Sequence, residues 1–254
     1  MINIYDGNNY FRIVLETDTT GLAPRTMLDK FRAVAEPTIW VWDGAKGNAK
    51  RREIYPDYKM NRTPLKKDIF AGFETVQEVL SHTPVIQVKV PGYEADDVIA
   101  ALARNYGRRR EQVAVYSSDA DFLQLVSEFP DNLFVGAKPK EHVPANLIRL
   151  YKTCVGDPSD NIPGIGGFGD VTWRNADKAQ LQALVDACVA GTAHPEIELP
   201  KRCHTWLGEN SSLVADFWNI VGFIPVDLDL ISEHMTVGKP DYAAADTYLK
   251  QWFL

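Results

Sequence analysis

Residues 37–43 read PTIWVWD, a run of β-branched and aromatic side chains that ends in an aspartate. Such a run is typical of a buried β-strand. Four further stretches have the same character, over residues 1–6, 84–89, 112–117 and 131–136. Each is short and rich in apolar residues, so the sequence predicts strands at all five places.

Helical patterns fill the spaces between these strands, over residues 25–35, 66–80, 94–106 and 144–154. Alternation of strands and helices is typical of an α/β fold, in which helices flank both faces of a mostly parallel central sheet. The strand pattern stops near residue 150. We therefore expect the remainder of the chain to be helical and rich in loops.

Three of the predicted strands end at an aspartate or run into one, namely Asp6, Asp43 and Asp119. In an open α/β sheet, ligands bind beyond the carboxyl ends of the strands. Because parallel strands place those ends on one edge, carboxylates that are distant in the sequence are expected to converge there.

The net charge of −7, from 34 acidic and 27 basic residues, would by itself argue against a nucleic-acid substrate. Phosphate binding relies on Lys and Arg. The acids are not spread evenly, however, and nine of them lie in short clusters. Setting these nine aside leaves a slightly positive balance, so the net charge does not exclude nucleic acid. The nine are Asp6, Asp43, Glu94, Asp96, Asp97, Asp119, Asp121, Asp157 and Asp160.

Taken singly, each acidic cluster has an ordinary explanation. Asp-Gly is a common turn, acids at a helix start offset the helix dipole, and an aspartate can cap a helix. Taken together, the clusters would repel one another by several kcal/mol at about 4 Å. Such packing requires raised pKa values or bound cations. Oxygen-only ligands favour Mg²⁺ or Mn²⁺, and a pair of such ions can promote phosphodiester cleavage.

The ordered motifs DGNN, WDG, YPDYKMNR, EADD, SSDADFLQL and GDPSDNIPGIGGFG resemble the 5′-nuclease family. That family includes phage 5′→3′ exonucleases, polymerase-associated 5′-nuclease domains and flap endonucleases. The resemblance covers about residues 1–175. It implies a stand-alone, phage-type enzyme. It implies a PIN-like α/β nuclease domain over 1–155, with a helical arch at about 46–82. It further implies a helix–hairpin–helix DNA-binding region with a helical tail over 156–254.

The resemblance also implies two Mg²⁺ ions, for which Mn²⁺ can substitute. The first ion would be held by Asp6, Asp43, Glu94 and Asp96. The second would be held by Asp119, Asp121 and Asp157, with Asp96 able to lie between the two. Asp97 and Asp160 match further acidic positions of the family that act partly through water.

Residues 46–67 read KGNAKRREIYPDYKMNRTPLKK, in which aromatic residues interleave the basic ones. A solvated basic loop would explain the charges alone, but stacking of bases on aromatic rings is common in single-strand binding. By resemblance this segment begins the arch, and Lys59 and Arg62 steady the scissile phosphate. The further DNA contacts implied are Arg51, Tyr58, which would stack on a terminal base, and Arg12.

The glycine-rich run from Ile162 to Gly169 resembles the hairpin of the helix–hairpin–helix region. Glycines let the backbone approach a phosphate or an ion closely, although a tight structural turn is an alternative. The resemblance implies that this run holds duplex DNA, together with a monovalent ion such as K⁺. The lysine that commonly follows is absent, and Val171 stands in its place. The DNA-binding glycines would be Gly164, Gly166, Gly167 and Gly169.

Three scattered cysteines are too few for a disulfide framework and predict a reducing, cytoplasmic compartment, that of the host if the protein is phage-encoded. No apolar run approaches the roughly 18 residues of a membrane span. The predicted function is hydrolysis of DNA near 5′ ends or flaps, in replication or repair, by a monomer. Two alternatives stay open: RNase H-type removal of RNA from RNA–DNA hybrids, and a non-catalytic module that binds branched DNA.

Overall fold

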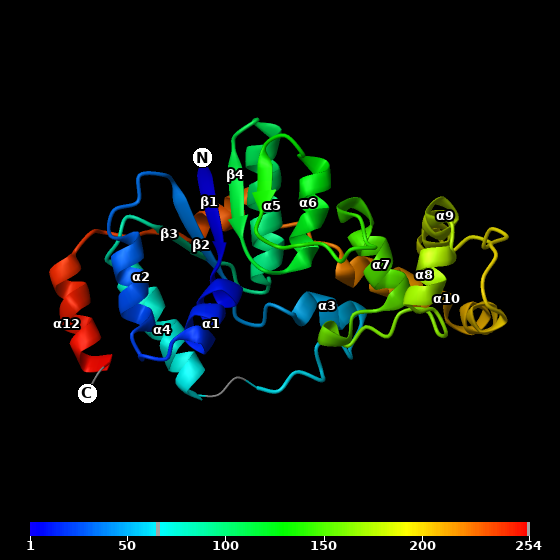
Figure 1. Ribbon diagram of the computed structural model, residues 1–254, viewed down its shortest axis with the longest axis horizontal. Coiled ribbons are helices and arrows are strands. Elements are labelled where there is room, and N and C mark those ends of the chain that lie inside the picture. The colour runs from blue at the N-terminus through cyan, green and yellow to red at the C-terminus, as the bar shows by residue number, and fades with distance from the viewer. Residues whose placement is uncertain (65–66, 253–254) are drawn as a thin grey trace. The chain divides into compact units, whose positions relative to one another are not determined.

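The computed structural model describes residues 1–64 and 67–252, which form two compact units (Figure 1). Each unit is assembled from separate stretches of the chain. The first consists of Met1–Gly47, Pro64–Lys138 and Pro225–Leu254, and the second of Asn48–Thr63 and Pro139–Ile224. The predicted boundary at residue 155 lies within the second unit. The regions 1–155 and 156–254 therefore stay a prediction from motif order.

The first unit contains the predicted α/β fold. Within the described residues, six strands form one sheet in the order β5-β4-β1-β2-β3-β6, and only β6 runs antiparallel to its neighbour. All five predicted strands are present, whereas β6 was not predicted. The strands are β1 (Ile2–Asp6), β2 (Thr38–Trp42), β3 (Ile86–Lys89), β4 (Val113–Tyr116), β5 (Leu133–Val135) and β6 (Met235–Val237).

Helices cover both faces of this sheet, which explains why the strands are rich in apolar residues and why β2 is buried along its whole length. On one face, Tyr5, Trp40 and Trp42 form a core with aromatic residues of α1 and α4. On the other, α5 packs across β1, β2 and β4 (Figure 1). The helices of this unit are α1 (Gly7–Thr17), α2 (Ala23–Phe31), α4 (Lys67–Ser81), α5 (Ala95–Arg108), α6 (Leu123–Glu128), α11 (Leu228–Glu233) and α12 (Tyr242–Trp252), with a 3₁₀ turn at Ala120–Phe122.

The segment predicted as a helical arch, 46–82, is divided between the two units. Its second half is α4, which packs against α1, α2 and α12 and buries Phe73, Val76 and Leu80. That half is therefore a covering helix of the sheet. Leu65 and Lys66, which belong to the predicted basic segment, lie outside the described residues.

The end of the chain returns to the first unit. Leu249 and Ala245 of α12 pack on Leu28 and Val79. The carboxylate of Asp246 accepts hydrogen bonds from Arg25 (2.7 Å) and Arg32 (3.0 Å). The predicted helical tail is thus part of the sheet's helical cover.

The second unit is helical, as expected for the part of the chain beyond the strands. Its helices α7, α9 and α10 pack together, and each buries one unpaired cysteine at that junction: Cys154, Cys188 and Cys203. Among the described residues, no helix has both the length and the apolar character needed to cross a membrane. The helices are α3 (Ala49–Ile54), α7 (Ile148–Val155), α8 (Asp170–Asn175), α9 (Lys178–Ala190) and α10 (Lys201–Val221), with 3₁₀ turns at Ala145–Leu147 and Pro158–Asp160.

Candidate active site

The carboxyl ends of three adjacent parallel strands carry the predicted aspartates. Asp6 is the last residue of β1, Asp43 directly follows β2, and Asp119 lies three residues beyond β4. Because β1 pairs with both β2 and β4, these ends lie side by side on one edge of the sheet. The convergence expected from the strand pattern is therefore present in the first unit.

Asp6 is the most buried of these three carboxylates. One oxygen, Oδ2, accepts a hydrogen bond of 2.8 Å from Ser117 Oγ, and Oδ1 accepts one of 3.1 Å from the Asn9 amide. Burial is the main cause that raises the pKa of Asp6 to about 7; the nearby charges of Asp43 and Asp119 add to it, and the two hydrogen bonds act in the opposite direction. A cation at this edge would offset both the cost of burying a charged Asp6 and its repulsion from Asp43 and Asp119.

Polar residues beside the aspartates connect the three strand ends. The Asn8 side chain accepts a 2.9 Å hydrogen bond from the Asp43 amide, and the Asn9 side chain accepts one of 2.9 Å from the Ser118 amide. Asp43 Oδ1 in turn accepts a hydrogen bond of 2.8 Å from the Ala95 amide at the start of α5. Sequence reasoning assigned no role to Asn8, Asn9 or Ser117. The signals available were their position shortly after strands and their place in the motifs DGNN and SSDADFLQL.

The remaining predicted ligands of the first unit lie at helix starts on the same edge. Glu94 precedes α5 and is buried, Asp97 is buried in the first turn of α5, and Asp96 beside it is partly exposed. Negative charges are favourable at this end of a helix. Asp119 starts the next 3₁₀ turn and accepts a 2.9 Å hydrogen bond from the Asp121 amide. The edge thus gathers Asp6, Asp43, Glu94, Asp96, Asp97, Asp119 and Asp121.

The donor set of this edge fits a hard divalent cation, since every candidate ligand is a carboxylate. Within residues 1–64 and 67–252, however, no three Asp, Glu, His or Cys side chains already stand close enough to hold an ion. Asp6, Asp43 and Asp119 each accept hydrogen bonds from a backbone amide or a hydroxyl group. Binding an ion would require some of these side chains to turn.

Asp157 and Asp160 belong to the second unit, in the tight turn after α7. Asp157 Oδ2 lies 2.8 Å from Lys152 Nζ, and Oδ1 accepts from Ser159 Oγ at 2.6 Å. Burial would raise the pKa of Asp157, but the Lys152 ammonium and the Ser159 hydrogen bonds hold it below its ordinary value. This carboxylate is therefore stabilised in its charged form.

Asp160 lies against the basic segment. Arg62 Nη2 is 2.7 Å and Lys59 Nζ is 4.0 Å from Asp160 Oδ1, while the Tyr58 hydroxyl donates to Oδ2 at 3.2 Å. The two predicted phosphate-binding cations thus share one internal carboxylate. Arg62 is half exposed, whereas Lys59 is largely buried beside the Tyr58 ring.

Two residues predicted to contact DNA, Tyr58 and Arg51, are buried, and their role at DNA stays a prediction. Tyr58 is 2% exposed, and its ring packs on Ile162 and Phe217. Arg51 is 3% exposed, and its guanidinium donates to the carbonyls of Ile220 (2.9 Å) and Gly222 (3.2 Å). Both therefore stabilise the second unit.

Arg12, which is predicted to contact DNA and lies outside the basic segment, is exposed on α1 of the first unit. Its Nε lies 2.7 Å from Glu16 Oε1, one turn further along the helix. An exposed pair of this kind contributes little stability. Arg12 therefore stays a prediction as a DNA contact.

The predicted hairpin glycines have different surroundings. A Cβ on Gly164, whose φ is +70°, would lie 2.5 Å from the Gly156 amide, and a Cβ on Gly166 would lie 2.2 Å from the Trp206 ring. Gly167 (φ +85°) faces the Arg202 side chain, whereas a Cβ on Gly169 would meet nothing within 4 Å. Close packing, together with the positive φ of Gly164 and Gly167, thus accounts for the first three. The helix–hairpin–helix assignment and the K⁺ site stay predictions.

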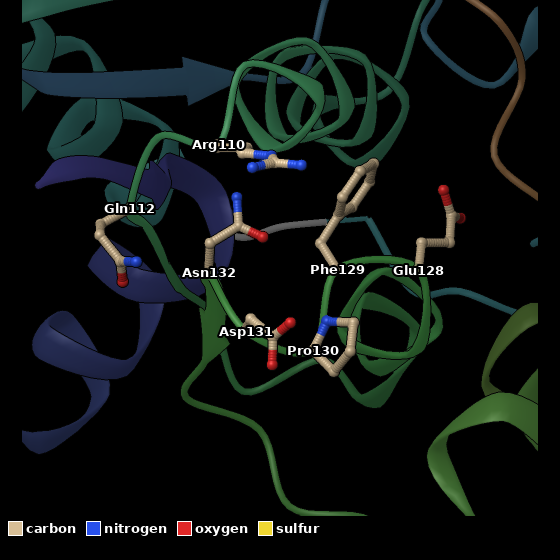
Figure 2. Close-up of a pocket in the computed structure, with 7 residues that line it drawn as sticks. All are labelled: Arg110, Gln112, Glu128, Phe129, Pro130, Asp131 and Asn132. Carbon is tan, nitrogen blue, oxygen red and sulfur yellow. The ribbon is translucent and has the colours of Figure 1, made fainter.

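A hollow of about 530 Å³ lies elsewhere on the first unit (Figure 2). Gln112 and Asn132 of its lining directly precede β4 and β5, so the hollow is at the amino ends of the strands. It is therefore at the opposite edge of the sheet from the aspartates. Its lining consists of Arg110, Gln112, Glu128, Phe129, Pro130, Asp131 and Asn132.

Known proteins share this sequence pattern and fold. A family model described as the 5′-3′ exonuclease, N-terminal resolvase-like domain, matches residues 20–146. A 5′-3′ exonuclease of Aquifex aeolicus is 30% identical over 206 residues, which cover 78% of this chain and 68% of that protein. A thermostable DNA polymerase I of Thermus filiformis is 33% identical over 156 residues, and this match spans only 19% of the polymerase.

Among solved structures, the chain is similar to the flap endonuclease of bacteriophage T5, in a complex with DNA and metal ions. The TM-score is 0.62 at 20% identity, and the match covers 99% of this chain and 97% of the other. At this identity the likeness concerns the fold. It supports the α/β nuclease architecture predicted from the sequence.

Proposed function

This chain belongs to the 5′-3′ exonuclease family, and we propose that its carboxylate edge hydrolyses DNA phosphodiester bonds near 5′ ends and at flaps by two-metal catalysis. Membership makes the protein a nuclease. The choice of substrate and the number of metal ions go beyond membership and are argued from the residues.

The observation that carries the proposal is the convergence of Asp6, Asp43 and Asp119 at the ends of β1, β2 and β4. The neighbouring aspartates contribute to raising the pKa of Asp6 to about 7, after the larger effect of burial. Folding does not favour such a group of acids by itself. A binding module would gain nothing from negative charge beside phosphates, whereas a metal-dependent nuclease requires it.

The cofactor proposed is Mg²⁺, two ions, with Mn²⁺ as a substitute. When bound, such ions supply an activated water and stabilise the charge of the leaving oxygen. The ligands proposed in the first unit are Asp6, Asp43, Glu94, Asp96, Asp119 and Asp121, with Asp97 acting through water. Asp157 and Asp160 of the second unit are proposed as further acidic positions.

The chain's own cations would bind the substrate. We assign phosphate binding to Lys59 and Arg62, because charge develops on the phosphate during cleavage. Arg12 is proposed as an outer DNA contact. Gly169 is proposed to bring the backbone near duplex DNA, because the space beside it is open. A K⁺ ion at the hairpin belongs to the same proposal.

The setting of the reaction is also proposed. The complexed flap endonuclease of bacteriophage T5 binds DNA and metal ions, which favours DNA over an RNA–DNA hybrid as the substrate here. We propose a monomer that acts in DNA replication or repair. The unpaired cysteines Cys154, Cys188 and Cys203 favour the cytoplasm, where thiols stay reduced.

A cleavage assay tests the proposal with labelled 5′-flap DNA and a matched RNA–DNA hybrid, in Mg²⁺ and in EDTA. We expect the protein to cut the flap in Mg²⁺ alone. Asp119→Asn should lower the rate by about 100-fold or more. The control is Asp131→Asn, an exposed acid at the opposite edge of the sheet, which should cut normally. Preferred cutting of the hybrid would favour the RNase H alternative. Binding without cleavage would favour the non-catalytic module.

A further inference from the structure

Within the second unit, the basic segment 57–62 is tied to the acidic turn 158–161. The two segments exchange hydrogen bonds in both directions, so neither can move without disturbing the other. The bonds are Lys59 N to Asp160 O (3.0 Å), Asn61 Nδ2 to Pro158 O (2.8 Å), Arg62 Nε to Ser159 O (3.2 Å) and Asn161 Nδ2 to Asp57 O (2.7 Å).

The Asp160 carboxylate lies where these contacts meet. It has Arg62 Nη2 at 2.7 Å, Lys59 Nζ at 4.0 Å and the Tyr58 hydroxyl at 3.2 Å. A carboxylate and a phosphate present similar anionic oxygens to a guanidinium, and arginine binds either with charge-assisted hydrogen bonds. The Arg62 and Lys59 contacts that Asp160 receives are therefore of the kind that a DNA phosphate would make.

The backbone conformation of Lys59 is one that the surrounding contacts impose. Its φ is +55°, in the left-handed region that lysine disfavours. The hydrogen bond from its amide to Asp160 O holds that conformation, and its ammonium lies 4.8 Å from the centre of the Tyr58 ring. The local structure thus directs Lys59 toward the same carboxylate as Arg62.

We propose that Asp160 is an internal counter-anion, which occupies the Lys59 and Arg62 cations and keeps a DNA phosphate from them in the metal-free protein. The inference rests on the proposed function, because it takes these two cations as the phosphate-binding pair. A phosphate must displace a carboxylate that is already in contact and must also overcome its repulsion.

A consequence is that phosphate binding depends on what happens to Asp160. A divalent cation that takes this carboxylate would release Arg62 and Lys59 to the substrate. Metal binding and phosphate binding would then be positively coupled, each favouring the other by the same factor. Asp160 would gate the basic segment in addition to any part it has in holding an ion.

The test measures binding of a labelled 5′-flap DNA in EDTA, over a series of salt concentrations. Asp160→Asn removes the charge and keeps the shape of the side chain. We expect it to bind at least about fivefold more tightly than the wild type, with a salt dependence steeper by about one phosphate contact. Asp57→Asn is the matched control, since it removes the same charge from an exposed side chain of the same loop. It should change the affinity less than about twofold.

A double variant locates the effect. In the Asp160→Asn protein, adding Arg62→Met should abolish the gain, whereas Arg62→Met alone should change binding in EDTA little. If Asp160→Asn folds poorly, as judged by thermal unfolding, Asp160→Ser carries the same test. Unchanged affinity, an equal gain in Asp57→Asn, or a gain that survives without Arg62 would each overturn the inference.

Failure of the counter-anion proposal can be distinguished from failure of the proposed nuclease function. A wild type that cuts flaps in Mg²⁺ while Asp160→Asn gains nothing in EDTA overturns the counter-anion alone. A wild type that neither binds nor cuts DNA overturns the proposed function, and the counter-anion with it.

Discussion

The Arg62 guanidinium and the Asp160 carboxylate lie 2.7 Å apart, although 98 positions separate them in the sequence. Arg51, earlier in the same basic segment, makes a different long-range contact, donating to carbonyls near the end of α10. The Arg62 side chain is 53% exposed and Arg51 is 3% exposed. Two arginines that look alike in the sequence therefore have different roles.

Substituting each arginine by methionine should separate these roles. Arg51→Met should lower the thermal midpoint by several degrees, because it leaves buried carbonyls without donors. Arg62→Met should change the midpoint less than Arg51→Met, since the Arg62 side chain is half exposed, but it should lower the single-turnover cleavage rate by about 10²-fold. Thermal unfolding and single-turnover kinetics on both variants check this. A destabilised Arg62→Met with normal cleavage would contradict it.

The hairpin glycines offer a second matched pair. Gly166→Ala should destabilise the protein by about 1–3 kcal/mol, because the new methyl group meets the Trp206 ring. Gly169→Ala should stay within about 0.5 kcal/mol of wild type, because the space beside it is open. Urea unfolding measures both. If Gly169 brings the backbone to duplex DNA, its alanine variant should bind duplex more weakly at unchanged stability. Equal unfolding midpoints for the two variants would show that Trp206 yields to the methyl group.

Val171 is 74% exposed, so a lysine at this position should be accommodated. We expect Val171→Lys to raise the affinity for duplex-containing substrates and to steepen the salt dependence by about one contact. Affinity for a bare single strand should change little. Binding to both substrates over a salt series provides the measurement. An equal gain on both would indicate nonspecific charge, and no gain on either would place Val171 away from the DNA.

Asp170 provides a pH test away from the metal-ligand candidates. Its carboxylate accepts hydrogen bonds from the Tyr151 hydroxyl and from His142, and these hold the pKa of Asp170 below its ordinary value. A carboxyl with a lowered folded-state pKa stabilises the fold above its unfolded pKa of about 4. That contribution is lost as the pH falls through the folded value.

Asp170→Asn should therefore destabilise the protein at pH 7, and its difference from wild type should shrink as the pH falls below about 4. Chemical unfolding at pH 7 and pH 3 gives the two free energies of unfolding for each protein. Asp186→Asn, an exposed acid on α9, serves as the control. A difference that stays constant with pH would mean that Asp170 acts through shape alone.

Much of the first unit could be predicted from local sequence. Strands such as Thr38–Trp42 are apolar because both faces of the sheet are covered, and this leaves a continuous run that is easily recognised. The convergence of Asp6, Asp43 and Asp119 followed from parallel strands alone. In contrast, β6 has three residues and pairs at the sheet's edge, so it carries no pattern of its own.

The second unit was harder to predict because its contacts join distant parts of the chain. Arg51 and Tyr58 lie in a segment rich in charge, which suggested solvent or DNA as their surroundings. Their actual partners, Ile220 and Phe217, are more than 150 positions away, and no local pattern indicates them. Burial of a charged side chain depends on tertiary partners that satisfy it.

The discontinuous second unit has a consequence for the protein during synthesis. Residues Asn48–Thr63 leave the ribosome before any of Pro139–Ile224 has been made. At typical rates of about 5–20 residues per second, the 98 positions between Arg62 and Asp160 correspond to an interval on the order of 5–20 s. During that interval the nascent chain presents its basic segment without the later carboxylate. The growing polypeptide should therefore adhere to anionic polymers more readily than the finished protein does.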